Sequence, residues 1–305
     1  MFPECHAAAA NHAIECDKGF FPFRDCEPLP FQGISPRYDL SDLTKEDFQT
    51  ILAGATAEAV IDIAETYDLE AGEYVVSADG ALPFSGPDCN GITGVIPYES
   101  NKVKITVSQP SNAKVLARLD RRTIVDADSC TAEHTAIVQD AMKRAGDMAA
   151  EAANAALNGD ARLFESFFRT TDTATRKTVA ARFDAIAREI RAGDNGTITY
   201  SCGDGMGGCS SKAAIAYAVS GRNLIVNCPT YYDIAKETKS CGGKDQALTI
   251  IHELTHMSSV FKPSTTDYAY GYDSVIALPK EKAIVNADTF LYYAGCKFVP
   301  VVALH

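Results

Sequence analysis

The chain has 305 residues, of which 46% are hydrophobic and 22% charged, and its formal net charge is −12. This composition is typical of one large or two medium globular domains and excludes a disordered or fibrous protein. No run of eighteen or more apolar residues occurs, so we expect no membrane-spanning helix. We expect neither a membrane nor a nucleic acid as a partner.

Cysteine usage indicates the compartment. The ten cysteines are widely spread and contain no CxxC pair: Cys5, Cys16, Cys26, Cys89, Cys130, Cys202, Cys209, Cys228, Cys241 and Cys296. An even number at such spacing favours up to five disulfides in an oxidising compartment over a thiolate metal site. We therefore expect a secreted, extracellular protein, although residues 1–16 show no basic segment followed by an apolar one, as a signal peptide would.

Residues 1–122 differ in texture and charge from the rest of the chain. Short runs typical of β-strands, such as "AVIDIAETYDL", "GEYVVSADG" and "KVKITVS", alternate there with Gly, Pro and Asn turns, which predicts a small β-rich, sandwich-like domain. This part contains 10 Lys+Arg against 19 Asp+Glu, whereas residues 123–305 contain 18 against 21. Most of the negative charge therefore belongs to the first domain.

The two parts meet at a dibasic pair, Arg121-Arg122, in a polar stretch. Such a pair is either an ordinary solvated pair of arginines or an exposed site for a subtilisin-like processing protease. Because composition and texture change at this point, we expect a domain boundary here, with domains at 1–122 and 123–305.

Long helical patterns follow the boundary. Residues 131–159 are rich in alanine and end on Asn158-Gly159, a C-terminal stop signal. Residues 172–193 begin at the capping-competent Asp172 and place an apolar stripe on one helical face, formed by Val179, Phe183, Ile186 and Ile190. The short apolar runs "TITYSC", "AAIAYAV" and "LIVNC" then predict a small β region. The second domain is thus expected to be mainly helical, within an α+β class.

The stretch "TIIHELTHMSS" carries an HExxH pattern formed by His252, Glu253 and His256. Two histidines four residues apart on a helix point to the same side, where both can bind one Zn²⁺. Glu253 can then hold a zinc-bound water and accept its proton as general base. The alternative for the bare pattern is a surface helix with two unremarkable histidines, and a third ligand distinguishes the two.

Each possible third ligand requires a different sequence after the HExxH pattern. A metzincin requires a glycine and a histidine where this chain has Ser259 and Lys262, so that class is excluded. A gluzincin requires a later glutamate, for which Glu281 remains a weak candidate. Asp267 follows His256 by eleven residues, which is close enough to return to the metal through a short turn, and a carboxylate oxygen is an acceptable zinc ligand.

The segment "STTDYAYG" gives the chain a family resemblance. HExxH followed by this segment resembles the deuterolysins, the aspzincin family of fungal secreted metalloendopeptidases. Their pattern GTxDxxYG is met by Ser264, Thr265, Asp267, Tyr270 and Gly271, with serine in place of the first glycine. A glycine required there for a positive φ would make the serine costly. Similar segments extend over essentially all of residues 123–305.

The resemblance implies a role for each matching residue. His252, His256 and Asp267 become the ligands of one Zn²⁺ per chain, and Glu253 the general base. Tyr270 either donates to the oxyanion of the tetrahedral intermediate or only packs in the core.

Residues around this constellation are expected to support it. Asp288 is expected to orient a ligand histidine, and Thr265 to fix the turn of the aspartate through a bond from its side chain to the backbone.

The resemblance also implies three disulfides in the second domain: Cys130–Cys202, Cys209–Cys228 and Cys241–Cys296. Cys5, Cys16, Cys26 and Cys89 remain for two bridges in the first domain, an arrangement that the even count favours over a cysteine thiolate inhibiting the zinc. Residues 1–122 resemble the prosegment of these proteases more faintly. On this interpretation a processing protease cuts after Arg121-Arg122, Thr123 becomes the mature N-terminus, and the chain is a zymogen.

The expected function is a monomeric, secreted, zinc-dependent endopeptidase that acts on protein or peptide substrates. The resemblance adds a leaning towards basic substrates, with which a net charge of −3 in the second domain is compatible. Two alternatives remain: a catalytically silent secreted binding protein or effector that keeps the fold, and a zinc hydrolase that does not cleave peptides. A silent protein would be expected to have lost a ligand or the base, and all four residues are present.

Overall fold

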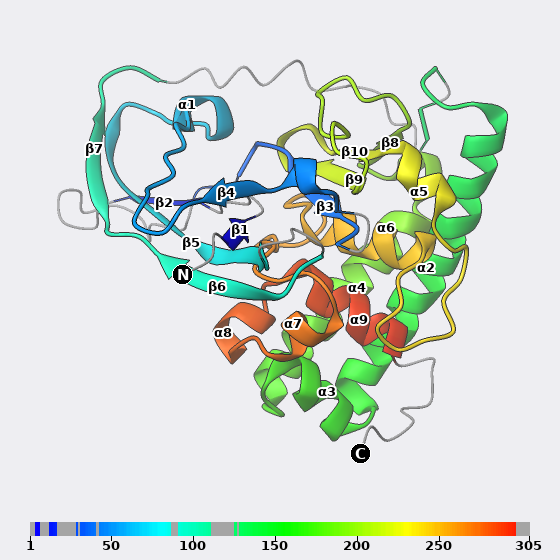
Figure 1. The fold of residues 1–305 in the computed structure, drawn as a ribbon. Coiled ribbons are helices and arrows are strands. Elements are labelled where there is room, and N and C mark those ends of the chain that lie inside the picture. Colours follow the sequence, from blue (N-terminus) through cyan, green and yellow to red (C-terminus); the bar gives the residue numbers. More distant parts are fainter. Residues whose placement is uncertain are drawn as a thin grey trace. The chain divides into compact units, whose positions relative to one another are not determined.

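The structure is a computed structural model that describes residues 4–6, 12–16, 29, 31–40, 43–86, 91–110, 125–126 and 128–296. The chain divides into two compact units (Figure 1). The first consists of Met1–Gly33 and Leu40–Arg118, and the second of Ile34–Asp39 and Leu119–His305. Among the described residues, no helix has both the length and the apolar character needed to cross a membrane.

The first unit is built around one long strand, β5 (Gly72–Ser85). Its first half pairs with β2 (His12–Cys16) and β7 (Val103–Val107), its second half with β1 (Glu4–His6) and β6 (Gly94–Glu99), and β4 (Gln49–Ile51) extends the sheet beyond β1. All these pairings are antiparallel. The unit also contains the 3-10 helix η1 (Lys45–Asp47). The strand-rich character is as predicted, and the sandwich-like arrangement stays a prediction.

The prediction of a strand is wrong in part for one of the runs. Within "AVIDIAETYDL", the structure has a short helix, α1 (Ile63–Thr66). Asp62 caps it, because its carboxylate accepts a hydrogen bond from the backbone N–H of Ala64 at 2.9 Å. An N-terminal cap next to alanine and glutamate, both good helix formers, outweighs the β preference of the isoleucines.

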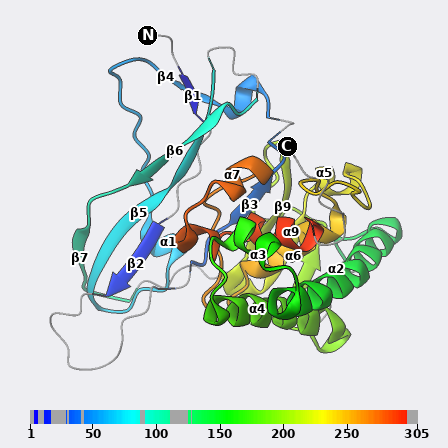
Figure 2. The same cartoon turned by 90° about the horizontal axis from the view of Figure 1, so that it is seen from below.

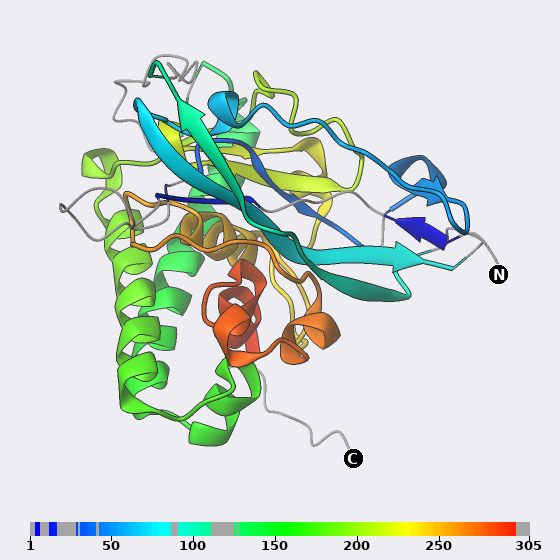
Figure 3. The same ribbon diagram turned by 90° about the vertical axis from the view of Figure 1, so that its left-hand side faces the viewer.

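The second unit contains a four-stranded sheet in the order β3-β9-β10-β8. Its strands are β3 (Ser35–Tyr38), β8 (Thr199–Ser201), β9 (Ala214–Val219) and β10 (Leu224–Asn227). β3 and β10 both run antiparallel to β9, and β10 is parallel to β8. The three strands predicted between residues 197 and 228 are confirmed. The fourth, β3, comes from far earlier in the chain and is the blue strand beside the yellow-green strands of this sheet in Figure 3.

Two long helices form the body of this unit and lie along one another, as Figure 2 shows. They are α2 (Ala132–Asn158), capped by Thr131, and α4 (Thr173–Arg191), capped by Asp172. The face of α2 is lined by fully buried alanines, which let the helix backbones approach closely: Ala141, Ala145, Ala149, Ala152 and Ala156. Both helices and the buried stripe of α4 are as predicted.

The remaining helices complete the unit. They are α3 (Ala161–Phe168), α5 (Pro229–Asp233), α6 (Gln246–Thr255), α7 (Tyr272–Ile276), α8 (Lys280–Ala283) and α9 (Ala287–Cys296), with 3-10 helices η2 (Gly193–Asn195) and η3 (Ser220–Arg222). Every residue of α6 is buried, because the helix contacts α2, α9 and β9. A helix surrounded on all sides is held rigidly, and α6 carries the HExxH pattern.

Three disulfides join parts of the second unit, and all three match the predicted pairing: Cys130–Cys202, Cys209–Cys228 and Cys241–Cys296. The side chains of Cys5, Cys16, Cys26 and Cys89 lie outside the described part of the chain, as do Arg121, Arg122 and Thr123. The two further bridges, the processing site and the division into domains at 122 therefore stay predictions. The mixture of helix and sheet agrees with the expected α+β class.

Candidate metal centre and active site

The HExxH pattern lies at the end of α6. Asp245 caps the start of the helix by accepting from the N–H of Leu248. The helix ends at Thr255, so His256 is the first residue after it, but its backbone is still helical at φ −74° and ψ −14°. The side chains of His252 and His256 therefore point to the same side, as the spacing predicts.

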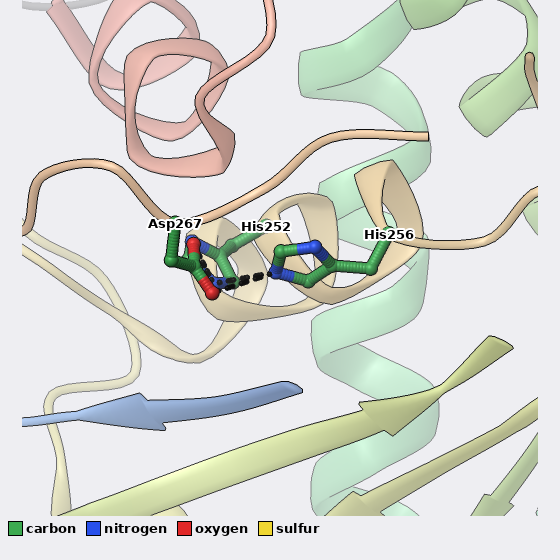
Figure 4. Close-up of side chains that lie close together, drawn as sticks. All are labelled: His252, His256 and Asp267. Atoms are coloured by element: carbon green, nitrogen blue, oxygen red, sulfur yellow. Dashed lines mark hydrogen bonds and ion pairs between the residues drawn. The ribbon is translucent and has the colours of Figure 1, made fainter. Parts of the chain in front are cut away.

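Asp267 completes a group of three possible ligands (Figure 4). The Nε2 atoms of His252 and His256 are 3.3 Å apart. The carboxylate oxygens of Asp267 lie 3.5 Å from Nε2 of His252 and 3.2 Å from Nε2 of His256. Ligand atoms about 2.0–2.1 Å from a tetrahedral Zn²⁺ are about 3.3 Å from one another. The three side chains thus have the spacing that a zinc ion requires.

The Nδ1 atom of each histidine forms a hydrogen bond with a residue outside this group of three. The Nδ1 of His252 is 2.7 Å from Oδ1 of Asp288, and the Nδ1 of His256 is 3.1 Å from the backbone oxygen of Thr265. When Nδ1 carries the proton and donates it, Nε2 keeps the lone pair that a metal needs. Asp288 therefore contacts His252 as predicted, and Thr265 fixes the second histidine through its carbonyl.

Glu253 lies beside this group and is completely buried. Burial raises the pKa of its carboxyl to about 8. Among the described residues, neither of its carboxylate oxygens has a hydrogen-bond partner. A buried acid without a protein partner is costly to keep, and its position suits an acid that bonds to a bound molecule.

The electrostatics of the three possible ligands favour a cation between them. Burial alone would raise the pKa of Asp267, but the neighbouring His256 and His252 lower it. Burial would likewise lower the pKa of His256, yet the Asp267 carboxylate raises it to about 9. The carboxylate thus attracts positive charge to His256. A Zn²⁺ ion supplies that charge without a proton and needs the neutral imidazole.

The loop that carries Asp267 is tied to α6. The N–H of Thr265 donates to the carbonyl of Thr255 at 3.0 Å, and the two hydroxyls are 2.6 Å apart. The expectation that the Thr265 side chain bonds to the backbone is wrong, because its hydroxyl contacts the side chains of Thr255 and His256 instead, the latter at 3.3 Å. Ser264 does not have a positive φ, so a serine is tolerated where the family usually has glycine.

The following turn is held by the start of α9. Asn286 accepts from the N–H groups of Tyr268 and Ala269 at 2.8 and 2.9 Å. Gly271 has a φ of 82°, a conformation that favours glycine, and its N–H donates to Asp288 at 3.0 Å. The last glycine of the motif is thus needed for backbone geometry, and Asp288 braces both the turn and His252.

Tyr270 is buried at the edge of the group. Its phenol donates a hydrogen bond to the carbonyl of Pro36 at 2.8 Å. Burial and the Asp267 carboxylate raise the pKa of Tyr270 well above its usual value, so the phenol keeps its proton. Its ring also lies 6.4 Å from that of His252. The phenol is therefore a hydrogen-bond donor, and its role in catalysis stays a prediction.

Three neighbouring residues were not singled out from the sequence: Arg37, Arg182 and Asn286. Arg37 lies 3.4 Å from Asp288 although it precedes it by 251 positions, and no local signal marks it. Asn286 stands in the segment "NADTF", from which the sequence predicts a role only for Asp288. The weak candidate Glu281 lies exposed on α8, outside the group of three possible ligands.

A buried helix with HExxH, whose glutamate has no hydrogen-bond partner among the described residues, and a carboxylate returning from the next loop define the class of zinc-dependent peptidases. A profile of the deuterolysin metalloprotease (M35) family matches residues 17–301. The chain belongs to this family and is therefore a zinc-dependent metalloprotease. The family resemblance inferred from the sequence is confirmed.

Two relatives that are similar in sequence agree with this assignment. A "neutral protease 2 homolog" of Blastomyces gilchristii is 43% identical over 275 residues, which cover 88% of this chain and 75% of the relative. A "probable neutral protease 2 homolog" of Arthroderma benhamiae is 38% identical over 291 residues, covering 90% and 78%. Among solved structures, a zinc peptidase from Grifola frondosa aligns with a TM-score of 0.45 and 19% identity, over 55% of this chain and 98% of its own.

Proposed function

We propose that this protein is a secreted endopeptidase that binds one Zn²⁺ per chain through His252, His256 and Asp267 and uses Glu253 as its general base. The observation that carries the proposal is the mutual spacing of the three ligand atoms, 3.2 to 3.5 Å. The unpaired carboxylate of Glu253 beside them adds to it. When bound, zinc supplies a Lewis acid that polarises the scissile carbonyl and acidifies a water molecule.

Glu253 performs the proton transfers of this mechanism. Its carboxylate accepts a proton from the attacking water and passes it to the amine of the leaving peptide. Burial favours the protonated form and so makes the carboxylate a stronger base than an exposed glutamate. Because no described residue bonds to its oxygens, the group is available to water and substrate.

Tyr270 is proposed to stabilise the developing oxyanion. Its phenol stays protonated and already donates to a peptide carbonyl, that of Pro36. A donor that satisfies a carbonyl in the ground state bonds more strongly to the negatively charged oxygen of the transition state. Asp288 is a positioning residue, because it holds His252 without belonging to the proposed ligand set.

The same proposal includes the substrates of the enzyme, its secretion and its maturation by proteolysis. We expect protein or peptide substrates with a preference for basic ones, cleaved by a monomer outside the cell. Three disulfides in the second unit support an oxidising compartment. The chain is proposed to be a zymogen, matured at Arg121-Arg122 by a processing protease so that Thr123 becomes its N-terminus.

Replacing Glu253 tests the function. We expect Glu253→Gln to keep its zinc, measured by elemental analysis, and to lose about 10²- to 10⁴-fold in the rate of casein or protamine hydrolysis, because general-base catalysis contributes that much. Glu281→Gln, an exposed acid outside the site, is the matched control and should cleave like the wild type. All variants are compared after maturation at Arg121-Arg122: undiminished hydrolysis by Glu253→Gln contradicts the mechanism, and zinc without hydrolysis in the matured wild type favours a silent binding protein.

A further inference from the structure

Residues Ile34–Asp39 belong to the second unit, whereas the chain before and after them belongs to the first. Within this segment, β3 pairs antiparallel with β9. Since the sheet order is β3-β9-β10-β8, β9 is the edge strand of a three-stranded sheet once β3 is left out. β9 also contacts α6, the helix that carries His252 and Glu253. The segment therefore adds a strand at the edge of the sheet next to the candidate active site.

The arginine in this strand extends into the candidate active site. Arg37 is only 2% exposed, and its Nη2 lies 3.4 Å from Oδ1 of Asp288, the same oxygen that bonds to His252. The register with β9 shifts between Arg37 and Tyr38, and such irregularities redirect a side chain out of the regular alternation. A positive side chain thus lies against the acid that positions a proposed zinc ligand.

The backbone of the same strand also accepts a hydrogen bond from Tyr270, the proposed oxyanion donor. The carbonyl of Pro36 accepts the hydrogen bond from the phenol of Tyr270 at 2.8 Å. On the mechanism proposed above, this phenol bonds to the carbonyl of the peptide that is cleaved. Pro36 and Arg37 together therefore provide what a substrate peptide provides: an extended backbone, a carbonyl at the oxyanion donor and a side chain near the metal ligands.

The hydrogen bonding of Arg37 is incomplete, which makes it easier for the segment to leave the candidate active site. Its Nε and Nη1 are buried without a hydrogen-bond partner among the described residues. A buried charge that is paired this incompletely contributes little to stability, because desolvation offsets its attraction to the acid. The segment is held as well by the ladder to β9, by an ion pair between Asp39 and Lys244, and by packing of Ile34 and Tyr38.

We propose that residues 34–39 are an internal inhibitor, which occupies the peptide-binding edge of β9 as an added strand and places Arg37 against Asp288, beside the proposed zinc ligands. The inference rests on the proposed function and names the segment that keeps the uncut chain inactive. Peptides commonly bind to a free sheet edge in this way, with main-chain bonds giving affinity and alternate side chains giving specificity. While tethered, the segment competes at an effective concentration in the millimolar range, and it loses that advantage once the chain is cut.

The test measures peptide binding to the uncut full chain, in a Glu253→Gln background so that no hydrolysis is needed. The probe is a fluorescein-labelled peptide with the sequence of residues 33–40, "GISPRYDL", followed by fluorescence anisotropy. Adding Arg37→Ala should tighten binding of the probe at least tenfold, because the internal copy competes less well. Arg188→Ala, the same change at an exposed helical position, is the matched control and should leave the affinity unchanged.

Two further measurements test whether the probe and residues 34–39 compete for the same site. A probe with alanine in place of its arginine should bind the Arg37→Ala chain at least tenfold more weakly than the original probe. If Arg37→Ala does not fold, as judged by circular dichroism, Lys244→Ala removes the ion pair with Asp39 at the end of the segment and should tighten binding about threefold, as expected for a partly exposed ion pair.

Equal affinity of the probe for the parent and the folded variants overturns the inference. This outcome is separate from the fate of the proposed function, because the probe binds without being cleaved. A matured wild type that hydrolyses casein while the affinities stay equal leaves the peptidase mechanism intact and removes only the inhibitory role of residues 34–39.

Discussion

Asp288 contacts three separate parts of the candidate site. Its two oxygens lie within hydrogen-bond or ion-pair distance of His252, Gly271 and Arg37. Burial would raise the pKa of this acid, but the Arg37 guanidinium and the bond to His252 lower it to about 2. It is therefore ionised at neutral pH, and its negative charge fixes the imidazole in the form that presents Nε2 to a metal.

Asp288→Asn should weaken zinc binding about 10- to 100-fold, since losing such a supporting carboxylate costs this much in metal affinity. The measurement is competition for zinc with a chelator of known affinity. Asp273→Asn, at an exposed position on α7, is the control and should bind zinc like the wild type. Unchanged affinity in Asp288→Asn would mean that the contact with His252 does not orient a ligand.

At the scale of elements, the site depends on the connection between α6 and α7. Arg182, from the middle of α4, is 2% exposed and donates to the backbone oxygens of Thr255 and Pro263 at 3.3 and 2.7 Å. Its guanidinium also lies over the rings of Phe261 and Phe290. One side chain thus joins the end of the HExxH helix, the loop leading to Asp267 and the helix α9.

Arg182→Ala should lower the free energy of unfolding by about 3 kcal/mol, because two buried carbonyls lose a charged donor and a cavity is left between two rings. Urea unfolding measures this change, and Arg188→Ala on the exposed side of the same helix should change it by less than about 0.5 kcal/mol. If both variants unfold alike, the connection does not depend on Arg182.

The sequence and the structure agree most where the signals are local. Capped helices with a regular apolar stripe, such as 173–191, need no distant partner to be recognised, and the spacing from His256 to Asp267 is short enough to form one motif. Arg37 and Asn286 could not be predicted in this way. Arg37 reaches the candidate site only because β3 joins a sheet formed some 180 residues later, and a lone asparagine shows no sign that it satisfies two backbone N–H groups.

At the scale of the whole molecule, the second unit is closed by disulfides of different span. Cys241–Cys296 joins the segment before α6 to the end of α9 across 55 positions, whereas Cys209–Cys228 spans 19. A crosslink restricts the unfolded chain more when its loop is longer. The longer bridge should therefore stabilise the body that contains α6 and α9 more strongly.

Replacing both Cys241 and Cys296 by alanine should lower the free energy of unfolding by about 4 kcal/mol, and replacing Cys209 and Cys228 by about 3 kcal/mol, as loop-closure entropy predicts. Denaturant titration of the two double variants against the wild type checks the order. A larger loss for the shorter bridge would show that native packing around the sulfurs, and not loop length, determines the effect.

The central claim is that His252, His256 and Asp267 bind one zinc ion. Crystals of the full chain, measured on both sides of the zinc absorption edge, test it most directly. We predict one anomalous peak per chain, about 2.0–2.2 Å from Nε2 of each histidine and from a carboxylate oxygen of Asp267. A zinc peak that Asp267 does not contact, or no zinc peak at these histidines in zinc-loaded crystals, would contradict the claim.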